Sequence, residues 1–254
     1  MENKDIKVIT SINNNLIKEF AKLKEKKYRI QKGEFLIEGD HLINEAYNAN
    51  SLKILLASND DILNKYDKCE KYKVSEDVIK KLSQTTSPQG LVGICDIKDT
   101  SVDYKKYQHI LILDDVKDPG NIGTLIRTSL AFDIDLIVMS NDSCDIYNDK
   151  VVRASQGAIF NIDIVYKDLK DEIKLMKESN IKIISTSLSA TIDVKDIKKM
   201  DKYAIILGNE AKGVSEDIQK MADINVIIPI SKKMESLNVA IAGAIMMYEV
   251  RKWK

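Results

Sequence analysis

The segment Ala204-Ile-Ile-Leu-Gly-Asn-Glu210 decides the fold class of this chain. An uninterrupted apolar run ends at Gly208, and polar residues follow at once. Such runs are typical of strands that are covered on both faces, as in a parallel sheet. Comparable apolar runs occur at residues 110–113, 136–139, 183–184 and 226–228.

Segments with helical patterns separate these runs, at residues 121–132, 149–154, 168–179 and 215–221. A last helix is predicted over 236–252, and it is so apolar that it must be buried in the core or against a second subunit. Strands that alternate with helices predict an α/β domain with a parallel sheet and helices on both faces.

The first hundred residues predict a smaller α/β unit of the same kind. Strands are expected at 35–37, 52–57 and 91–97, and helices at 11–27, 39–49 and 75–82. This alternation favours parallel pairing. Residues 98–108 are polar and patternless, so we divide the chain into a domain at 1–97, a linker at 98–108 and a domain at 109–254.

The charges of the 254 residues cancel, with 39 Lys and Arg against 39 Asp and Glu. Bulk charge therefore cannot attract nucleic acid, and any basic surface must be local. One segment around Tyr28 carries a local charge of +5. It is either a solvated helix face or a patch that contacts phosphates. Its basic residues are Lys18, Lys22, Lys24, Lys26, Lys27, Arg29 and Lys32.

Several classes of protein are not expected. No run of 18 apolar residues predicts a transmembrane helix, and the first residues lack a signal-peptide pattern. Cys69, Cys95 and Cys144 are scattered, and with only two histidines they predict no metal site. We therefore expect a cytoplasmic protein with no membrane segment and no metal.

Three polar turns follow predicted strands, at residues 118–123, 207–213 and 228–238. None of them is a Walker P-loop or a GxGxxG dinucleotide fingerprint. Open α/β sheets nevertheless bind ligands at the carboxyl ends of their strands, so we expect a ligand site there that lacks a standard nucleotide-binding motif.

Polar side chains near these turns form a candidate cluster. Arg127, one of only four Arg beside 35 Lys, lies among apolar neighbours and would need carboxylate, phosphate or carbonyl partners if it were buried. Glu210, Ser236 and Asn238 accompany it, and Asn121 begins the helix that carries it. Each could equally be a cap or turn residue. The absence of His and Cys from the cluster argues against nucleophilic triad chemistry.

These segments carry a resemblance. Asn121-Ile-Gly-Thr-Leu-Ile-Arg127, the turn 207–213, and Ile228-Pro229-Ile230 with Glu235-Ser236-Leu237-Asn238 resemble the three motifs of the TrmH/SpoU family, RNA 2′-O-ribose methyltransferases of the SPOUT superfamily. Residues 150–160 also resemble a family segment, and the likeness spans about 108–250. The N-terminal unit, notably Phe35-Leu-Ile-Glu-Gly39, is similar to the ribosomal-protein-like substrate-binding domain of the family.

The resemblance implies a C-terminal trefoil knot, a homodimer and the cofactor S-adenosylmethionine. By motif position, the cofactor contacts fall on Gly208, Ile228 and Leu237, with Leu207 and Asn209 nearby and a further wall at 186–188. The full predicted set is Thr186, Ser187, Leu188, Leu207, Gly208, Asn209, Ile228 and Leu237.

The implied reaction is methyl transfer to a ribose 2′-oxygen, in which the protein chiefly aligns the reactants. The family assigns activation of the hydroxyl to Arg127, but arginine is effectively always protonated. We therefore expect Arg127 to bind phosphate and stabilise developing negative charge. The other predicted catalytic residues are Asn121, Glu210, Ser236 and Asn238, with Asn121 orienting Arg127 within one subunit or across the dimer.

RNA contacts are predicted for Lys22, Lys26, Lys27 and Arg29, and for Arg153 in the family-like segment 150–160. Ribosomal RNA is favoured over tRNA because the N-terminal domain resembles those of rRNA-directed members. Lys232 stands where the family usually has glycine, so it could reshape its loop or add a phosphate contact. The alternatives are a tRNA 2′-O-methyltransferase, a base methyltransferase, and a non-catalytic RNA-binding or ribosome-assembly protein.

Overall fold

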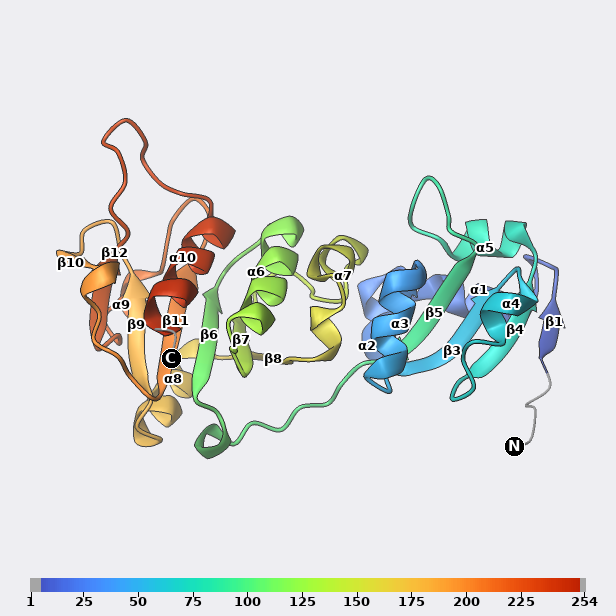
Figure 1. Cartoon of the computed structure of the whole chain (residues 1–254), viewed down its shortest axis with the longest axis horizontal. Helices are drawn as coiled ribbons and strands as arrows, with labels where there is room; N and C mark the ends of the chain where they lie inside the picture. The colour runs from blue at the N-terminus through green and yellow to red at the C-terminus, as the bar shows by residue number, and fades with distance from the viewer. Residues whose placement is uncertain (1–5, 252–254) are drawn as a thin grey trace. The chain divides into compact units, whose positions relative to one another are not determined.

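The computed structural model of the protein describes residues 6–251 and divides into two compact units (Figure 1). The first unit contains the chain up to Asp99 together with Tyr147–Phe160. The second contains Thr100–Ile146 together with the chain from Asn161 onward. The chain therefore passes between the units three times, and the predicted linker 98–108 includes the first passage and the short 3-10 helix η1 (Tyr104–Lys106).

The first unit is built on a five-stranded sheet in the order β1-β4-β3-β5-β2. The strands are β1 (Lys7–Ile9), β2 (Glu34–Glu38), β3 (Leu52–Ala57), β4 (Glu70–Val74) and β5 (Leu91–Asp96). β1, β4 and β3 are parallel, whereas β5 is antiparallel to both β3 and β2. The expected parallel pairing is therefore wrong at β5. Residues 83–90 carry the chain back after α5 (Glu76–Leu82), so that β5 starts at the edge where β4 ends.

Helices cover both faces of this sheet. Ile17 and Phe20 of α1 (Asn15–Lys22) pack in one cluster with Leu82 of α5 and with Leu36 and Leu56 of the strands. Strand residues alternate between faces, so Phe35 lies on the opposite side from Leu36. The remaining helices of the unit are α2 (Lys26–Lys32), α3 (Asp40–Asn48), α4 (Asp60–Leu63), α7 (Asp149–Ser155) and the 3-10 helix η2 (Ala158–Phe160).

The segment Tyr147–Phe160 belongs to the first unit although it lies between two strands of the second. The ring of Phe35 lies 4.5 Å from that of Tyr147 and 6.2 Å from that of Phe160, measured between centroids. Gly157 has a φ of +86°, and a Cβ there would lie 2.4 Å from Cγ of Glu45. Glycine is therefore required both by the backbone and by the close approach to α3.

The helix predicted over 11–27 is divided into α1 and α2. The side chain of Asn14 accepts from the amide of Leu16 at 2.8 Å and caps the start of α1. Nη1 of Arg29 on α2 donates to the carbonyls of Leu23 at 3.0 Å and Lys24 at 2.8 Å, just after α1 ends. These bonds satisfy carbonyls that a helix end leaves without a partner.

The second unit contains a seven-stranded sheet in the order β10-β12-β9-β11-β6-β7-β8. Every pairing is parallel, which confirms the expected parallel sheet. β8 and β10 were not predicted from the sequence. The strands are β6 (His109–Asp114), β7 (Leu136–Ser140), β8 (Asp163–Lys167), β9 (Lys182–Thr186), β10 (Ile192–Asp193), β11 (Tyr203–Gly208) and β12 (Ile224–Ile227).

Both faces of this sheet are covered by helices, as expected. Ile112 and Ile206 pack with Ile173 of α8 (Leu169–Glu178) and Ile218 of α9 (Glu216–Gln219). The opposite face meets α6 (Pro119–Ala131) and α10 (Val239–Arg251). Gly243 lets α10 approach closely, because a Cβ there would lie 2.5 Å from Leu125 and 2.7 Å from Leu207. Another 3-10 helix, η3, spans Val194–Asp196.

Side-chain caps set the starts of α6 and α10. Oδ1 of Asp118 accepts from the amide of Asn121 at 2.8 Å, so α6 begins before the predicted residue 121. Oδ1 of Asn238 accepts from the amides of Ala240 at 2.9 Å and Ile241 at 3.2 Å, so α10 begins after the predicted residue 236. The predicted end of this helix, Lys252, lies outside the described residues.

The trefoil knot stays a prediction, because strand order and pairing do not by themselves establish how the chain is threaded. Across residues 6–251, no helix combines the length and the apolar character needed to span a bilayer.

Candidate functional site

A cavity of about 530 Å³ opens at the carboxyl end of the parallel sheet in the second unit. This is the edge at which open α/β sheets bind ligands. Its walls come from the segments that follow β9, β11 and β12 and from the start of α10. All the predicted cofactor residues line it: Thr186, Ser187, Leu188, Leu207, Gly208, Asn209, Ile228 and Leu237. Glu210 and Ser236 of the predicted catalytic set also line it.

Gly208 brings two backbone segments unusually close together at this cavity. A Cβ on Gly208 would lie 2.1 Å from the carbonyl carbon of Gly213 and from the amide nitrogen of Val214. The backbones of Asn209 and Gly213 exchange two hydrogen bonds, of 3.0 and 2.8 Å. Gly213 has a φ of +70°, which glycine adopts without strain. The turn after β11 is therefore fixed by backbone contacts that a larger side chain would break.

Backbone groups shape the second wall as well. The amide of Ser187 donates to the carbonyl of Val226 at 2.9 Å, and Oγ1 of Thr186 donates to the carbonyl of Ile206 at 3.2 Å. These bonds tie the end of β9 to its two neighbouring strands. The cavity lining combines aliphatic residues with polar ones, and four of the lining residues are charged: Glu210, Lys212, Glu216 and Glu235.

Three side chains from the three predicted motifs form one hydrogen-bonded chain. Nδ2 of Asn121 donates to Oε1 of Glu210 at 3.1 Å. Nδ2 of Asn238 in turn donates to Oδ1 of Asn121 at 2.9 Å. The start of α6, the turn after β11 and the start of α10 are thus joined beside the cavity.

Glu210 also accepts hydrogen bonds from the backbone. The amide of Asp118 donates to its Oε1 at 3.1 Å, and the amide of Lys117 donates to its Oε2 at 3.3 Å. Partial burial acts to raise the pKa of Glu210, but the bonds from Asn121 and the backbone amides outweigh it, so the net pKa is lowered. The group is therefore held as a carboxylate at neutral pH.

Comparison with known proteins identifies the group to which these motifs belong. The pattern that defines the SpoU rRNA methylase family matches residues 108–248. The chain belongs to this family. The family predicted from the motifs is thereby confirmed. A second pattern, the MRM3-like substrate binding domain, matches residues 14–93, within the first unit.

Full-length relatives and solved structures agree with the SpoU assignment. The 23S rRNA (guanosine(2553)-2′-O)-methyltransferase RlmP of Bacillus subtilis is 32% identical, over 97% of this chain and 100% of its own length. The AdoMet-bound rRNA methyltransferase of Sinorhizobium meliloti is 28% identical with a TM-score of 0.88, covering 97% of this chain and 98% of that one. The SpoU methyltransferase AviRb of Streptomyces viridochromogenes shares the fold, with 23% identity, a TM-score of 0.85 and coverage of 94% and 98%.

In this SpoU-family protein, Arg127 lies apart from the hydrogen bonds that join Asn121, Glu210 and Asn238. Its side chain is exposed on α6 and is not among the described residues that line the cavity. Neither Asn121 nor Glu210 forms a hydrogen bond with Arg127 in the same protomer. The sequence predicts that Asn121 orients Arg127 either within one subunit or across the dimer, and the first of these arrangements is not seen. Six residues separate it from Asn121, a rise of about 9 Å along a helix.

The predicted RNA-contacting lysines lie at the surface of the first unit, but Arg29 does not. Lys26 and Lys27 are exposed and Lys22 is partly exposed. Arg29 is only 6% exposed, and its guanidinium binds the carbonyls at the end of α1. The predicted RNA contact of Arg29 stays a prediction, and the burial of its guanidinium argues against it. The burial of Arg29 could not be predicted from the sequence, because the local pattern does not distinguish a charged residue that caps a neighbouring helix from one that faces solvent.

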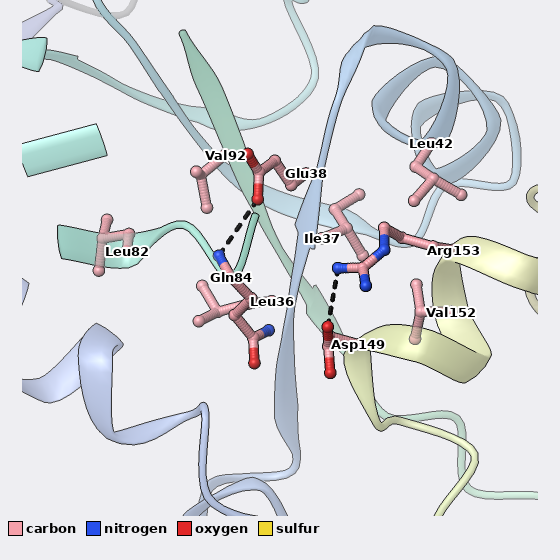
Figure 2. Close-up of a pocket in the computed structure, with 10 residues that line it drawn as sticks. All are labelled: Leu36, Ile37, Glu38, Leu42, Leu82, Gln84, Val92, Asp149, Val152 and Arg153. Atoms are coloured by element: carbon pink, nitrogen blue, oxygen red, sulfur yellow. Dashed lines mark hydrogen bonds and ion pairs between the residues drawn. The ribbon is translucent and has the colours of Figure 1, made fainter. Parts of the chain in front are cut away.

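Arg153 lies on α7 and faces a small cavity inside the first unit (Figure 2). Its Nη1 forms an ion pair with Oδ2 of Asp149 at 2.7 Å. Glu38 across this cavity accepts a hydrogen bond from the amide of Gln84 at 3.3 Å. The cavity, at about 20 Å³, has room for little more than water. The sequence does not indicate that Arg153 belongs to the first unit.

Proposed function

We propose that this protein transfers the methyl group of S-adenosylmethionine to the 2′-hydroxyl of a ribose in ribosomal RNA. The observation that carries the proposal is the cavity at the sheet's carboxyl edge, beside which Glu210, Asn121 and Asn238 are joined. Family membership and the AdoMet-bound relative from Sinorhizobium meliloti support the cofactor and the reaction.

The lining of the cavity suits this cofactor. Aliphatic walls such as Leu207 and Ile228 fit an adenine ring, and exposed backbone groups around Gly208 offer hydrogen bonds to adenosine and to the amino-acid tail. The absence of a side chain at Gly208 lets the backbone of Gly213 and Val214 pack closely behind that wall. Bound there, the cofactor supplies a methyl group already activated on a sulfonium. Methyl transfer from an activated sulfonium needs no metal.

The remaining task is to align a ribose and its phosphate. Glu210, fixed by three hydrogen bonds, and Asn121 set the geometry of the start of α6, while Ser236 and Asn238 shape the entrance for the ribose. Arg127 supplies a permanently charged guanidinium that binds the RNA phosphate and stabilises negative charge developing on the 2′-oxygen. Placement of reacting groups, rather than a nucleophile in the protein, is what this site offers.

A homodimer completes the proposed site. Arg127 projects from α6, outside the cavity of its own chain. Exposed apolar side chains lie on the same pair of helices, with Leu130 on α6 and Ile241 (53% exposed) and Tyr248 (51% exposed) on α10. Such side chains are suited to a two-fold interface. In that arrangement, Arg127 of one protomer serves the cavity of its partner.

The target is taken from a relative that aligns over its full length. Because RlmP of Bacillus subtilis aligns over its whole length, guanosine 2553 of 23S rRNA, or its equivalent, is the first nucleotide to examine. Exposed Lys232 and Lys233, on the loop before α10, would add phosphate contacts. A ribosomal RNA substrate also favours the cytoplasm as the place of action.

The proposal is tested with purified protein, a methyl-labelled cofactor and transcripts of 23S rRNA and of tRNA. We expect label in the 23S transcript at a nucleotide whose 3′ linkage resists alkali, because the attacking 2′-hydroxyl is blocked. Arg127→Ala serves as the inactive control, and Lys174→Ala on α8 serves as a surface control with normal activity. Label in an alkali-sensitive position, or in tRNA alone, would refute the proposal.

A further inference from the structure

The basic segment of the first unit separates into buried and exposed charges. Nζ of Lys24 donates to the carbonyls of Lys81 at 2.8 Å and Ser83 at 2.7 Å, and the guanidinium of Arg29 is buried against the end of α1. These two cations hold the fold together. The others stay at the surface of α1 and α2 and define what we call the α1–α2 basic surface: Lys18, Lys22, Lys26, Lys27 and Lys32.

The two faces of this unit differ in charge. The α1–α2 basic surface includes five lysines, against Glu19 and Glu25. On the other side of the sheet, α3 lies with the segment that stacks on Phe35, because Gly157 packs against Glu45 and Nε2 of His41 lies 3.1 Å from the carbonyl of Gln156. Residues 40–69 there are acidic, with five carboxylates against three lysines, a net charge of −2. The carboxylates are Asp40, Glu45, Asp60, Asp61 and Asp67.

Tyr28 lies within the α1–α2 basic surface, and two of its lysines lie over the tyrosine ring. Nζ of Lys27 lies 4.6 Å from the centroid of the Tyr28 ring, and Nζ of Lys22 lies 5.6 Å from it. Attraction between an ammonium group and the face of an aromatic ring adds to the ion pairs that already restrict these side chains, Lys22 with Glu19 at 2.5 Å and Lys27 with Glu25 at 3.7 Å. A pair of cations whose positions are restricted in advance loses less entropy when it binds a phosphate.

We propose that the α1–α2 basic surface is where the first unit docks on RNA, with Lys22 and Lys27 seated on the phosphate backbone and Tyr28 as the residue that positions them. This rests on the proposed function, because it assumes an RNA substrate. The acidic face across the sheet would repel phosphates, so the unit presents one face to RNA. A chain of zero net charge gains affinity for RNA in this way, from one polarised unit.

The test measures affinity for a 23S rRNA transcript, by filter binding, across a series of salt concentrations. The double variant Lys22→Glu/Lys27→Glu should bind on the order of 10–100-fold more weakly. The slope of log K against log salt should also be shallower, by the amount that corresponds to roughly two lost phosphate contacts. The matched control is Lys68→Glu. Lys68 also lies over a tyrosine ring, 5.7 Å from the centroid of Tyr47, but within the acidic face. Its affinity and salt slope should equal those of the wild type.

The positioning role has its own readout. Tyr28→Leu keeps every charge, so its salt slope should stay unchanged while its affinity falls by about threefold to fivefold. Tyr28→Phe keeps the ring and should bind like the wild type. Equal losses for Lys68→Glu and the double variant, or a normal slope for the double variant, would overturn the assignment of this face. A wild-type protein that failed to retain or methylate the transcript would instead refute the proposed function, and the docking surface with it.

Discussion

The side-chain amide of Asn121 donates a hydrogen bond to Oε1 of Glu210 across 3.1 Å, and so joins the start of α6 to the turn after β11. Asn238 completes the chain by donating to Asn121 at 2.9 Å. Asn121 is the middle residue of the three, because its side-chain amide both donates to the carboxylate of Glu210 and accepts from the amide of Asn238.

Replacing Asn121 should uncouple these segments without unfolding them. In Asn121→Ala, Glu210 retains the amides of Lys117 and Asp118, so the cavity and cofactor affinity should be preserved within about threefold. The rate of methyl transfer should fall on the order of 10–100-fold, because Glu210 and Asn238, which help to align the ribose, lose their hydrogen bonds to Asn121. Single-turnover kinetics and calorimetric cofactor titration measure the two effects. Cofactor affinity that fell as much as the rate would show that Asn121 supports the cavity itself.

Glu210 should make the stability of the protein depend on pH at the acidic end. Its pKa in the folded state is lowered from 4.5, so its contribution to the free energy of unfolding is present above 4.5 and is lost as the pH falls through the folded pKa. Glu210→Gln should therefore be less stable than the wild type at pH 7, by an amount that shrinks below the unfolded pKa. Urea unfolding at several pH values tests this. Glu178→Gln on the exposed side of α8 makes the same charge change and controls for net charge.

A side chain at Gly208 should abolish cofactor binding. The atoms that an added Cβ would meet, 2.1 Å away, belong to the backbone of Gly213 and Val214, and backbone cannot rotate aside as a side chain can. Gly208→Ala should therefore displace the turn after β11 and remove measurable affinity for S-adenosylmethionine in calorimetry. Gly33→Ala is the control. Gly33 has a φ of +65° but no atom within 4 Å of an added Cβ, so that variant should cost about 1 kcal/mol of stability and bind the cofactor normally.

The sheet of the second unit could be predicted because its central strands carry a local signal. Residues 110–113 and 204–207 are continuous apolar runs, and they became β6 and β11 at the middle of the sheet. β4 was missed because its sequence, Glu-Lys-Tyr-Lys-Val, has charged residues in a strand whose Lys71 is nevertheless buried. β1 and β10 are short edge strands with too few residues to show a period.

Other features depend on contacts that only the folded chain creates. Nothing local in residues 147–160 indicates that they leave the second unit to pack on Phe35. The burial of Arg29 likewise depends on where α1 ends and α2 turns back. By contrast, the turns that line the cavity follow directly from strand order, because the carboxyl ends of parallel strands meet at one edge.

Arg127 provides the sharpest test of how the site is assembled. Arg127→Ala should abolish transfer while leaving cofactor affinity within a few-fold, since the side chain is exposed and does not line the cavity. A mixed dimer then distinguishes action within a subunit from action on the partner. One protomer carries Arg127→Ala and the other carries Gly208→Ala, with different affinity tags for purification.

If Arg127 serves the partner's cavity, the mixed dimer has one complete site. The Arg127→Ala protomer binds the cofactor, and the Gly208→Ala protomer supplies the guanidinium. Its activity should then be about half that of the wild-type dimer, since one of two symmetric sites is restored. If Arg127 acted on its own cavity, each site would lack either the arginine or the cofactor. An inactive mixed dimer would therefore place the arginine and the cavity it serves within the same protomer, contrary to its exposed position on α6.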